Sequence, residues 1–135
     1  TAFSYLETNV KENNSSVKPV MADALKICDT FADGELDLIV SNPPYIKSAD
    51  IETLQKEVRL EPRLALDGGE DGYDFYREIV SRWSRKLKKG GALAFELGEN
   101  QADAVKALMT DKGFSDFKIS LDFGGVQRAI IGTLL

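Results

Sequence analysis

Histidine is absent from the 135-residue sequence, and its absence excludes several kinds of catalytic site. Ser-His-Asp and Cys-His nucleophiles both need an imidazole as general base. Zinc sites built on histidine are excluded for the same reason, and we expect no metal site. Any chemistry must therefore depend on carboxylates, amides, hydroxyls, backbone groups or a bound cofactor.

Cysteine is nearly absent too, because Cys28 is the only one in the chain. An intrachain disulfide is therefore impossible, and a reducing compartment is expected. No apolar run approaches the ~20 residues that cross a bilayer as a helix. These features predict a cytoplasmic protein without a membrane partner.

The sequence also lacks an excess of positive charge, since its net charge is −5. Domains that bind nucleic acid usually carry a basic patch or stripe, so no direct nucleic-acid partner is expected. The nearest candidate patch consists of Arg82, Arg85, Lys86, Lys88 and Lys89. We interpret it as the solvent face and C-terminal end of one helix, where the helix dipole favours cations.

What the sequence does contain is an alternation of helix and strand patterns, which is typical of an α/β domain. Apolar residues at helical spacing predict helices over residues 2–12, 74–88 and 100–113, with a short polar helix over 48–57. Apolar runs predict strands over residues 17–22, 36–41 and 92–97, followed by an antiparallel pair over 117–121 and 128–134. Residues 59–72 are expected to form a loop.

The most informative stretch is "IVSNPPYIK", residues 39–47, where an apolar strand stops at an asparagine and two prolines. Ligands of open α/β sheets bind beyond the carboxyl ends of the strands, and this is where Asn42 is expected to lie. Pro43 and Pro44 have fixed φ angles and no N–H groups, so the chain is stiff here. The Asn42 side-chain oxygen and the Pro43 carbonyl become candidate hydrogen-bond acceptors, with Tyr45 as an aromatic wall.

Two acceptors on a stiff segment suit a planar NH2 group. Such a nitrogen is a poor nucleophile because its lone pair is delocalised. Accepting both N–H bonds orients the nitrogen and stabilises the positive charge that it gains on attacking a carbon electrophile. The alternative is that Asn-Pro-Pro is an ordinary turn after a strand, and the residues alone leave both interpretations open.

At this point the sequence resembles a known family. Asn42-Pro43-Pro44-Tyr45 resembles the N-P-P-Y signature of class I S-adenosylmethionine-dependent methyltransferases that modify planar nitrogens. Three more segments resemble the HemK/PrmC family of protein-(glutamine-N5) methyltransferases, which modify the Gly-Gly-Gln loop of peptide-chain release factors. These segments are "EVRLEPRLALDGGEDGYDFYREIV" (57–80), "GGALAFELGENQADAV" (90–105) and "DFGGVQRAIIG" (122–132). The resemblance extends over nearly the whole chain.

The resemblance implies a role for each residue of the N-P-P-Y run. Asn42 and the Pro43 carbonyl would be the catalytic groups that hold the substrate glutamine amide. Pro44 and Tyr45 would shape the substrate pocket. A peptide-chain release factor is therefore the implied partner.

The resemblance also implies S-adenosyl-L-methionine as cofactor. Asp23 would reach the adenine amino group, Ala24 would lie beside the adenine ring, and Asn42 would border the cofactor as well as the substrate. The glycine-rich turn and the acidic ribose-binding residue of the family have no counterpart among these residues.

The implied fold is a partial class I methyltransferase domain, a Rossmann-like three-layer sandwich with strands 3 to 7 only and a C-terminal antiparallel pair. We expect residues 1–135 to be the C-terminal portion of the catalytic domain, without the N-terminal substrate-docking domain and inactive in isolation. Residues 17–22 would be the third strand and residues 36–41 the fourth, with none between them. We therefore expect that residues 17–22 dock on the fourth strand or that another chain covers its edge.

Two other functions remain open. An adenine-N6 methyltransferase of nucleic acid could use the same N-P-P-Y run, and a non-catalytic α/β module could self-associate through an exposed sheet edge. Glu96, Glu61 and Arg59 lie in family-like segments, but we interpret them as structural residues. The glycines at 68, 69 and 72 do not fit a phosphate-binding pattern, and we interpret them as part of a flexible loop.

Overall fold

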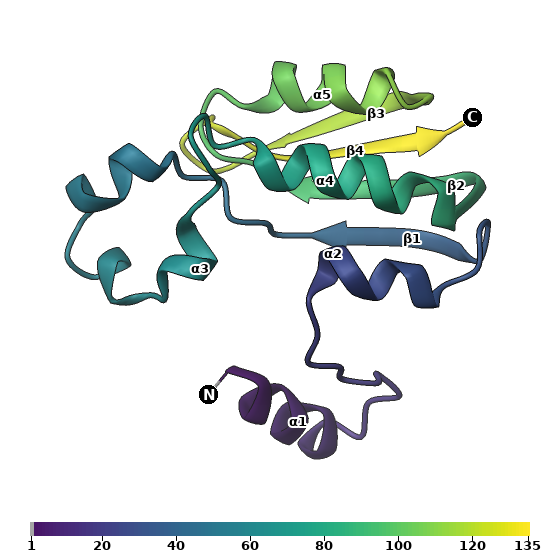
Figure 1. Ribbon diagram of the computed structural model, residues 1–135, viewed down its shortest axis with the longest axis horizontal. Helices are drawn as coiled ribbons and strands as arrows, with labels where there is room; N and C mark the ends of the chain where they lie inside the picture. The colour runs from purple at the N-terminus through teal and green to yellow at the C-terminus, as the bar shows by residue number, and fades with distance from the viewer. Residues whose placement is uncertain (1) are drawn as a thin grey trace.

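A computed structural model describes residues 2–135 as a four-stranded sheet with helices of different lengths (Figure 1). The helices are α1 (Ala2–Glu12), α2 (Ala24–Ile27), α3 (Arg63–Leu66), α4 (Asp74–Trp83) and α5 (Ala102–Thr110). The strands are β1 (Leu36–Ser41), β2 (Leu87–Glu96), β3 (Phe114–Leu121) and β4 (Gln127–Leu134). Short 3-10 helices lie at Cys28–Thr30, Ser48–Thr53, Val58–Leu60 and Ser84–Lys86.

The strands lie in the order β1-β2-β4-β3, so the first strand of the chain is at one edge of the sheet. β1 is parallel to β2, and α4 forms the crossover between them. β4 is antiparallel to both β2 and β3, which confirms the predicted C-terminal antiparallel pair. Since β1 and β2 are parallel, their carboxyl ends meet at the same edge of the sheet, where ligands of such sheets bind.

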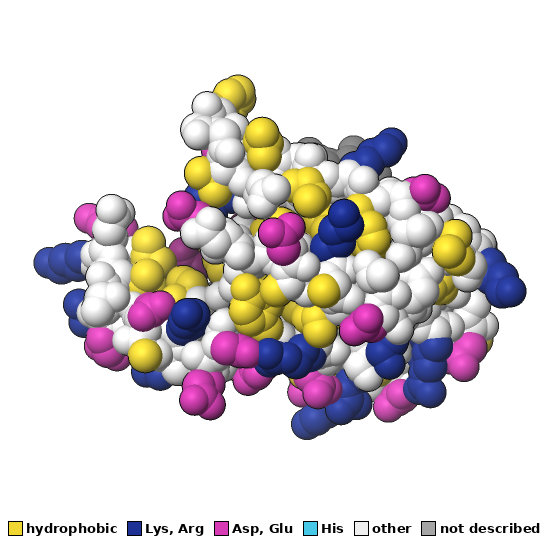
Figure 2. Space-filling model, turned by 90° about the horizontal axis from the view of Figure 1, so that it is seen from above, with side chains coloured by type: hydrophobic (Ala, Val, Ile, Leu, Met, Phe, Trp, Pro, Cys, Tyr) yellow, Lys and Arg dark blue, Asp and Glu magenta, His cyan; other side chains and the backbone are white. Residues whose placement is uncertain are grey.

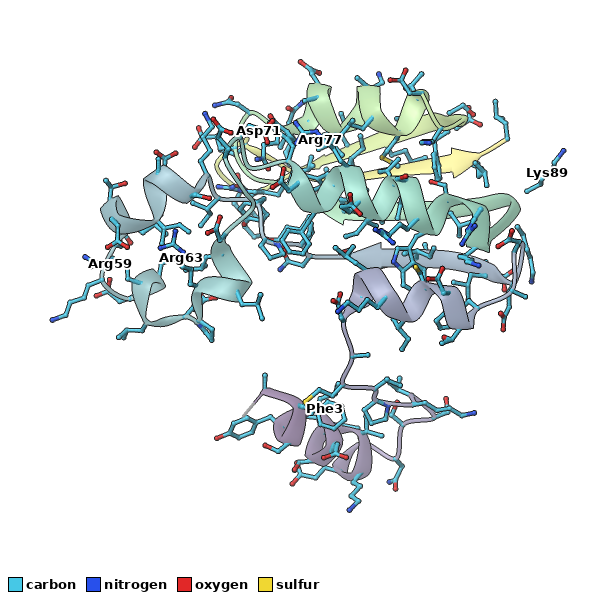
Figure 3. All side chains as sticks on the ribbon, in the orientation of Figure 1. Phe3, Arg59, Arg63, Asp71, Arg77 and Lys89 are labelled. Atoms are coloured by element: carbon cyan, nitrogen blue, oxygen red, sulfur yellow. The ribbon has the colours of Figure 1, made fainter. Side chains whose placement is uncertain are left out.

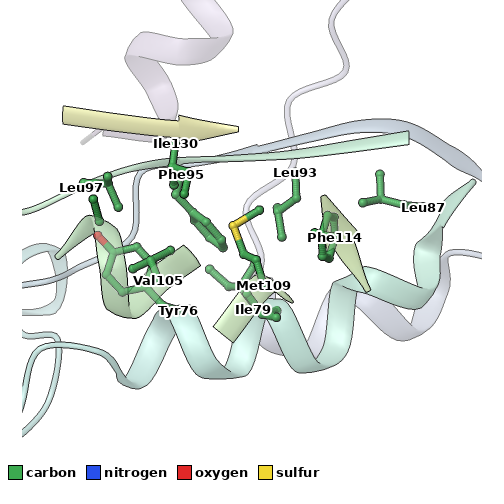
Figure 4. Close-up of a cluster of buried hydrophobic side chains, with 12 residues drawn as sticks. Tyr76, Ile79, Leu87, Leu93, Phe95, Leu97, Val105, Met109, Phe114 and Ile130 are labelled. Carbon is green, nitrogen blue, oxygen red and sulfur yellow. The ribbon is translucent and has the colours of Figure 1, made fainter. Parts of the chain in front are cut away.

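The core lies between the sheet and the helices α4 and α5 (Figure 4). On α4, Tyr76, Ile79 and Val80 recur at helical spacing and are buried. Alternate residues of β2 and β4 face them from the sheet, because successive side chains of a strand point to opposite faces. The buried side chains of the sheet include Leu93, Phe95 and Ile130; Leu97 directly after β2 and Val105 and Met109 of α5 complete the core.

The opposite face of the sheet is open along β1. Leu38 is 54% exposed and Val40 is 70% exposed, although both are apolar and lie on a strand. Figure 1 shows α1 lying apart from the sheet, and α1 buries none of its residues. The described residues therefore supply two layers of the predicted sandwich, the sheet and the helices on one of its faces.

The predicted strand over residues 17–22 does not form. This segment is irregular, and Val17, Val20 and Met21 are exposed. Pro19 within it cannot donate to a strand ladder, which confines proline to edges and bulges. The expectation that residues 17–22 dock on the neighbouring strand was therefore wrong, and β1 remains an unpaired edge among residues 2–135. The predicted position of Thr1 at or inside a helix lies outside the described residues.

The predicted helix 74–88 is too long, because α4 ends at Trp83 and β2 already begins at Leu87. Lys86, which the prediction placed on the solvent face of this helix, is only 4% exposed, so that placement was wrong. Its ammonium donates to the Phe31 carbonyl and to Asp33, both at 2.7 Å, and this satisfies a buried charge. The Gly90-Gly91 pair then lies inside β2 instead of ending the helix.

The remaining residues of the predicted basic patch are largely neutralised. Arg82 pairs with Glu78 at 2.7 Å, Arg85 with Asp29 at 3.2 Å and Lys88 with Asp37 at 2.6 Å. Figure 3 labels Lys89 at the far end of the sheet from the carboxyl ends of β1 and β2. On the face shown in Figure 2, acidic and basic side chains are interspersed and form no continuous basic stripe. Among the described helices, none is long and apolar enough to cross a membrane.

Residues 48–66 form an arm that projects beyond the carboxyl ends of β1 and β2 (Figures 1 and 3). The polar helix predicted there is a 3-10 helix, Ser48–Thr53. The predicted loop over residues 59–72 contains a further short 3-10 turn and α3. Arg63 pairs with Asp67 at 3.1 Å and Arg59 with Glu52 at 3.6 Å, so these side chains brace the arm.

Candidate functional site

The site is centred on residues 42–45, which follow directly after β1 and which we call the shelf. In the strand register Ser41 lies opposite Phe95, so Asn42 and Glu96 follow side by side at the carboxyl ends of β1 and β2. The Pro43 ring is buried, whereas Asn42 is exposed. Among the described residues, none hydrogen-bonds to the Asn42 side chain or donates to the Pro43 carbonyl. Both predicted acceptors are therefore free.

The chain after the shelf is held by the loop that precedes α4. Ile46 N–H donates to the Leu66 carbonyl at 3.0 Å, and Gly68 N–H donates to the Ile46 carbonyl at 2.7 Å. A Cβ atom at Gly68 would lie only 2.7 Å from the Tyr45 Cα, so a larger residue cannot fit without moving the shelf. Gly68 is therefore a close-packing position, and our interpretation of it as flexible loop was incomplete.

Gln101, which directly precedes α5, ties the shelf to two other segments. Its side chain is buried, since the residue is 8% exposed. Nε2 donates to the Tyr45 carbonyl at 3.1 Å and lies 3.5 Å from the Gly72 carbonyl. Oε1 accepts from Gly98 N–H at 2.9 Å. One amide thus joins the shelf, the loop before α4 and the turn after β2.

Tyr76 of α4 completes this buried network. Its hydroxyl lies 2.8 Å from the Glu96 carbonyl and 3.1 Å from Gln101 Oε1, and it can donate to either oxygen. Burial raises the pKa of Tyr76 well above its ordinary value, so the hydroxyl remains a donor. The network fixes the backbone of Glu96 relative to the shelf.

Tyr45 places its hydroxyl on Glu96. The hydroxyl donates to Glu96 Oε1 at 3.1 Å. Burial, and after it the negative charge of Glu96, raises the pKa of Tyr45 above its ordinary value of 10.0. Tyr45 therefore stays protonated at neutral pH and both closes the side of the site and orients the carboxylate.

Two cavities meet at the shelf. The shelf cavity, of about 320 Å³, lies toward the arm, and its lining includes Asn42, Pro43, Tyr45, Glu61 and Glu96. The open-face cavity, of about 490 Å³, lies on the uncovered side of the sheet; it is lined by Val40, Ser41, Asn42, Ala94, Phe95, Glu96, Arg128 and Ala129. A third cavity, of about 480 Å³, is lined by Pro44 and Asn42 among others. Asn42 thus lies where all three cavities adjoin.

The two other predicted cofactor residues lie elsewhere. Asp23 Oδ1 accepts from Leu25 N–H at 2.9 Å and so caps the N-terminus of α2. The Ala24 carbonyl accepts from the Trp83 indole at 3.0 Å. Neither Asp23 nor Ala24 lines the cavities around the shelf. The structure therefore brings together residues 42–45, but it does not bring to them Asp23 and Ala24, the two residues predicted to contact adenine.

The sequence interpretation missed the functions of Gln101 and Tyr76 and treated Glu96 as a strand end. Gln101 is 56 residues from Tyr45 along the chain, so no local pattern reveals their contact. The available signal was a glutamine immediately before a helix, in a chain whose polar residues otherwise lie mainly on the surface. For Glu96, the signal was its place at the end of a strand, since the ends of parallel strands meet at one edge of the sheet and Asn42 directly follows another strand.

An ion pair fixes the loop that packs on the shelf, and it gives a pH-dependent prediction. Asp71 pairs with Arg77 of α4 (Figure 3), and this hydrogen bond lowers the pKa of Asp71 from 3.8 to about 2. Because the folded-state pKa is depressed, the pair stabilises the fold above pH ~4, and this contribution is lost as the pH falls toward about 2.

The expected result is that Asp71→Asn lowers the thermal midpoint at pH 5 and that the difference from the unmodified protein shrinks on acidification to pH 2. Asparagine keeps the oxygen that accepts from Tyr73 N–H but loses the charge. Thermal unfolding followed by circular dichroism measures both curves. Asp50→Asn, on the exposed arm, is the matched control. If the difference in thermal midpoint between Asp71→Asn and the unmodified protein did not change with pH, the charge of Asp71 would not be what stabilises the fold.

Two curated relatives of this chain carry the same name. The chain is 49% identical over 107 residues to a release factor glutamine methyltransferase of Geobacter sulfurreducens, a match covering 78% of this chain and 38% of that protein. It is 34% identical over 131 residues to the release factor glutamine methyltransferase of Thermodesulfovibrio yellowstonii, covering 96% of this chain and 46% of that protein. No family model matches the chain.

Solved structures agree with the predicted fold class. A methyltransferase from Pyrococcus furiosus matches 97% of this chain and 56% of its own, with a TM-score of 0.68 and 23% identity, which shows the shared fold. A release-factor-specific protein-(glutamine-N5) methyltransferase from Alicyclobacillus acidocaldarius matches 82% of this chain and 54% of its own, with a TM-score of 0.50 and 26% identity. The fold is thus part of a class I methyltransferase domain, as predicted.

The chain spans less than half the length of these two curated relatives, 38% and 46%. Within that span the sequence match, the parallel β1–β2 pair and the antiparallel β4 agree with one family. By sequence and fold, the chain is therefore a member of the release factor glutamine methyltransferase family and corresponds to part of its members' length.

Proposed function

We propose that the protein containing these residues transfers a methyl group to the side-chain amide nitrogen, N5, of a glutamine in peptide-chain release factors. The observation that carries this proposal is the pair of free acceptors, Asn42 Oδ1 and the Pro43 carbonyl, at the mouth of a cavity beyond β1. A primary carboxamide has two N–H donors in one plane, and the shelf offers two acceptors on stiff backbone. The curated names of the relatives support the same substrate.

The shelf would act by orientation and by charge. Asn42 and Pro43 accept the two N–H bonds of the glutamine amide and hold the nitrogen at the junction with the open-face cavity. Partial negative charge on both oxygens stabilises the positive charge that the nitrogen gains as it forms a new bond. No general base is required for this first step.

S-adenosyl-L-methionine, the proposed methyl donor, supplies an electrophilic methyl group on a cationic sulfur. The open-face cavity fits such a group, because it combines apolar walls, Val40 and Ala94, with the carboxylate of Glu96. Asn42, directly after β1, borders the same cavity. We propose Asp23 and Ala24 as contacts to adenine, on the resemblance alone.

The domain assignment belongs to the same proposal. Residues 1–135 would be the C-terminal portion of the catalytic domain, an assignment that rests on the resemblance; the share of each relative that the chain covers agrees with a part of the length. We propose that the isolated chain is inactive. The cytoplasmic location is supported by the free thiol of Cys28.

A methylation assay tests the proposal. The complete protein is incubated with radiolabelled S-adenosyl-L-methionine and either a release factor, the same release factor with its Gly-Gly-Gln glutamine replaced by alanine, or DNA and RNA. The expected result is label in the first release factor only. Label in nucleic acid alone would instead support an adenine-N6 methyltransferase, against which the interspersed surface charges of Figure 2 count.

A second candidate function, self-association, is favoured by the unpaired edge of β1 and the exposed side chains of Leu38 and Val40. An apolar unpaired strand edge is a template for pairing with another chain. The double substitution Leu38→Lys and Val40→Lys places two charges on this edge. It should raise the dissociation constant of an associated 135-residue chain by ~10-fold or more, which corresponds to a loss of about 1.4 kcal/mol in the free energy of association.

Sedimentation at several concentrations measures the association. Leu60→Lys, at an exposed position on the arm, is the matched control and should change nothing. A chain that is monomeric at every concentration before substitution would remove this candidate.

A further inference from the structure

We propose that Glu96 is a third catalytic group, whose carboxylate stabilises the positive charge on the amide nitrogen and takes up its proton. This inference rests on the proposed methyl transfer. It adds to the shelf a residue from a different strand, β2, which neither the resemblance nor the N-P-P-Y run assigns to catalysis.

The first argument is position. Of the residues that line the shelf cavity and the open-face cavity, only Asn42 and Glu96 are common to both. Transfer between a donor in one cavity and an acceptor in the other requires the reacting atoms to meet where the cavities adjoin. Asn42 directly follows β1 and Glu96 ends β2, so both stand at that junction, at the carboxyl ends of neighbouring parallel strands. Glu96 therefore lies where charge develops.

The second argument is that the Glu96 carboxylate is oriented but not neutralised. Its Oε1 accepts from the Tyr45 hydroxyl at 3.1 Å, and its carbonyl lies 2.8 Å from the Tyr76 hydroxyl. Within residues 2–135, neither a lysine nor an arginine forms an ion pair with it. Arg128 lines the same open-face cavity, but its guanidinium pairs with Asp122 at 3.0 Å.

This arrangement suits a group that acts on a cation formed during the reaction. A carboxylate already paired with arginine would have its charge compensated before the reaction began. One held only by a neutral tyrosine hydroxyl keeps a full negative charge for the transition state, at no further cost in reorganisation. The second oxygen, Oε2, has no hydrogen bond from the described residues and remains available.

The electron balance of the step is simple. The nitrogen lone pair forms the new N–C bond to the methyl carbon, and the electrons of the breaking C–S bond pass to the leaving sulfur, which becomes a neutral thioether. The nitrogen then carries a positive charge, and one N–H bond breaks, with its electrons returning to nitrogen. The proton leaves its hydrogen bond with the Asn42 oxygen, passes through one water to Glu96 Oε2, and later goes to solvent. The product is a neutral N-methyl amide.

Steady-state kinetics of the complete protein with release factor test this assignment. Glu96→Gln keeps the size of the side chain and an oxygen for Tyr45 but removes the charge. The expected result is a fall in kcat of about 10²–10³-fold, the range for loss of one group stabilising transition-state charge. KM for the release factor should change less than about threefold, because ground-state binding depends on the shelf. Calorimetry without cofactor should give the same affinity of a Gly-Gly-Gln peptide for both proteins.

Controls separate this inference from its alternatives. Glu99→Gln, three residues further along and outside both cavities, should leave kcat unchanged. If glutamine at position 96 prevents folding, Glu96→Ala with added formate replaces it, and recovery of rate by formate but not by formamide is expected. An unchanged kcat in Glu96→Gln, or no rescue by formate, overturns the role of Glu96 while methylation by the unmodified protein upholds the proposed function. Absence of methylation in the unmodified protein overturns both.

Discussion

Replacing Asn42 with alanine in the complete protein should lower kcat for methylation of a release factor by about 10²–10³-fold, or roughly 3–4 kcal/mol of transition-state stabilisation. The substitution removes one of the two acceptors that hold the amide nitrogen, and it removes it at the point where positive charge appears. The other acceptor is a backbone carbonyl and stays in place, so part of the rate enhancement should survive.

The fold should hardly respond to this change. The Asn42 side chain is exposed and has no hydrogen-bond partner among residues 2–135, so its loss leaves no buried group unpaired. Asn42→Ala should therefore unfold within about 0.5 kcal/mol of the unmodified protein, as surface substitutions usually do. If Asn42 is catalytic, its replacement must therefore lower kcat strongly and leave the free energy of unfolding nearly unchanged.

Single-turnover kinetics with saturating release factor measures the rate, and urea unfolding measures the stability. Asn13→Ala, at an exposed asparagine after α1 that bonds only to the Asn9 carbonyl, is the matched control. Methyl transfer at the unmodified rate in Asn42→Ala would show that the shelf is only a turn after a strand, which the residues alone could not exclude.

The parts of the structure that local patterns govern could be predicted. Hydrophobic periodicity predicts the strand β1, the buried stripe of Tyr76, Ile79 and Val80 on α4, and the antiparallel pair β3–β4. Each of these patterns depends on residues that are only a few positions apart in the chain. The free acceptors of the shelf also follow locally, because proline fixes its own backbone and that of the preceding residue.

The errors lie where distant contacts decide. Residues 17–22 have the apolar composition of a strand, but Pro19 among them cannot donate to a strand ladder, and the segment leaves the edge of β1 unpaired, so composition was misleading. Lys86 looked like part of a solvated basic helix end, yet its ammonium is buried against Phe31 and Asp33, more than 50 residues earlier in the chain. The contact between Gln101 and the shelf is of the same kind and has larger consequences for the site.

Replacing Gln101 with leucine should destabilise the complete protein by about 3 kcal/mol. Leucine has nearly the same size but leaves the Gly98 N–H and the Tyr45 carbonyl without a partner in a buried region. Each unsatisfied buried group costs about 1–3 kcal/mol. Gln55→Leu, at an exposed position on the arm, is the matched control and should change stability by less than about 0.5 kcal/mol.

The same substitution should lower kcat although Gln101 lines neither of the two cavities. Its Nε2 holds the Tyr45 carbonyl, and Tyr45 in turn orients Glu96, so the shelf and the carboxylate lose their common support. A misplacement of about 1 Å can cost on the order of 10²-fold in rate. The effect should persist at low temperature, where the variant is fully folded.

A double-mutant cycle with Tyr76→Phe distinguishes one connected network from two independent contacts. Tyr76 and Gln101 lie 3.1 Å apart, oxygen to oxygen, and residues in one network usually couple by 0.5–3 kcal/mol. Urea unfolding of the two single variants and the double variant gives the coupling energy, and the same proteins give the coupling in kcat. Strictly additive effects in both measurements would mean that the two residues support the site independently, Gln101 through the Tyr45 carbonyl and Tyr76 through the Glu96 carbonyl.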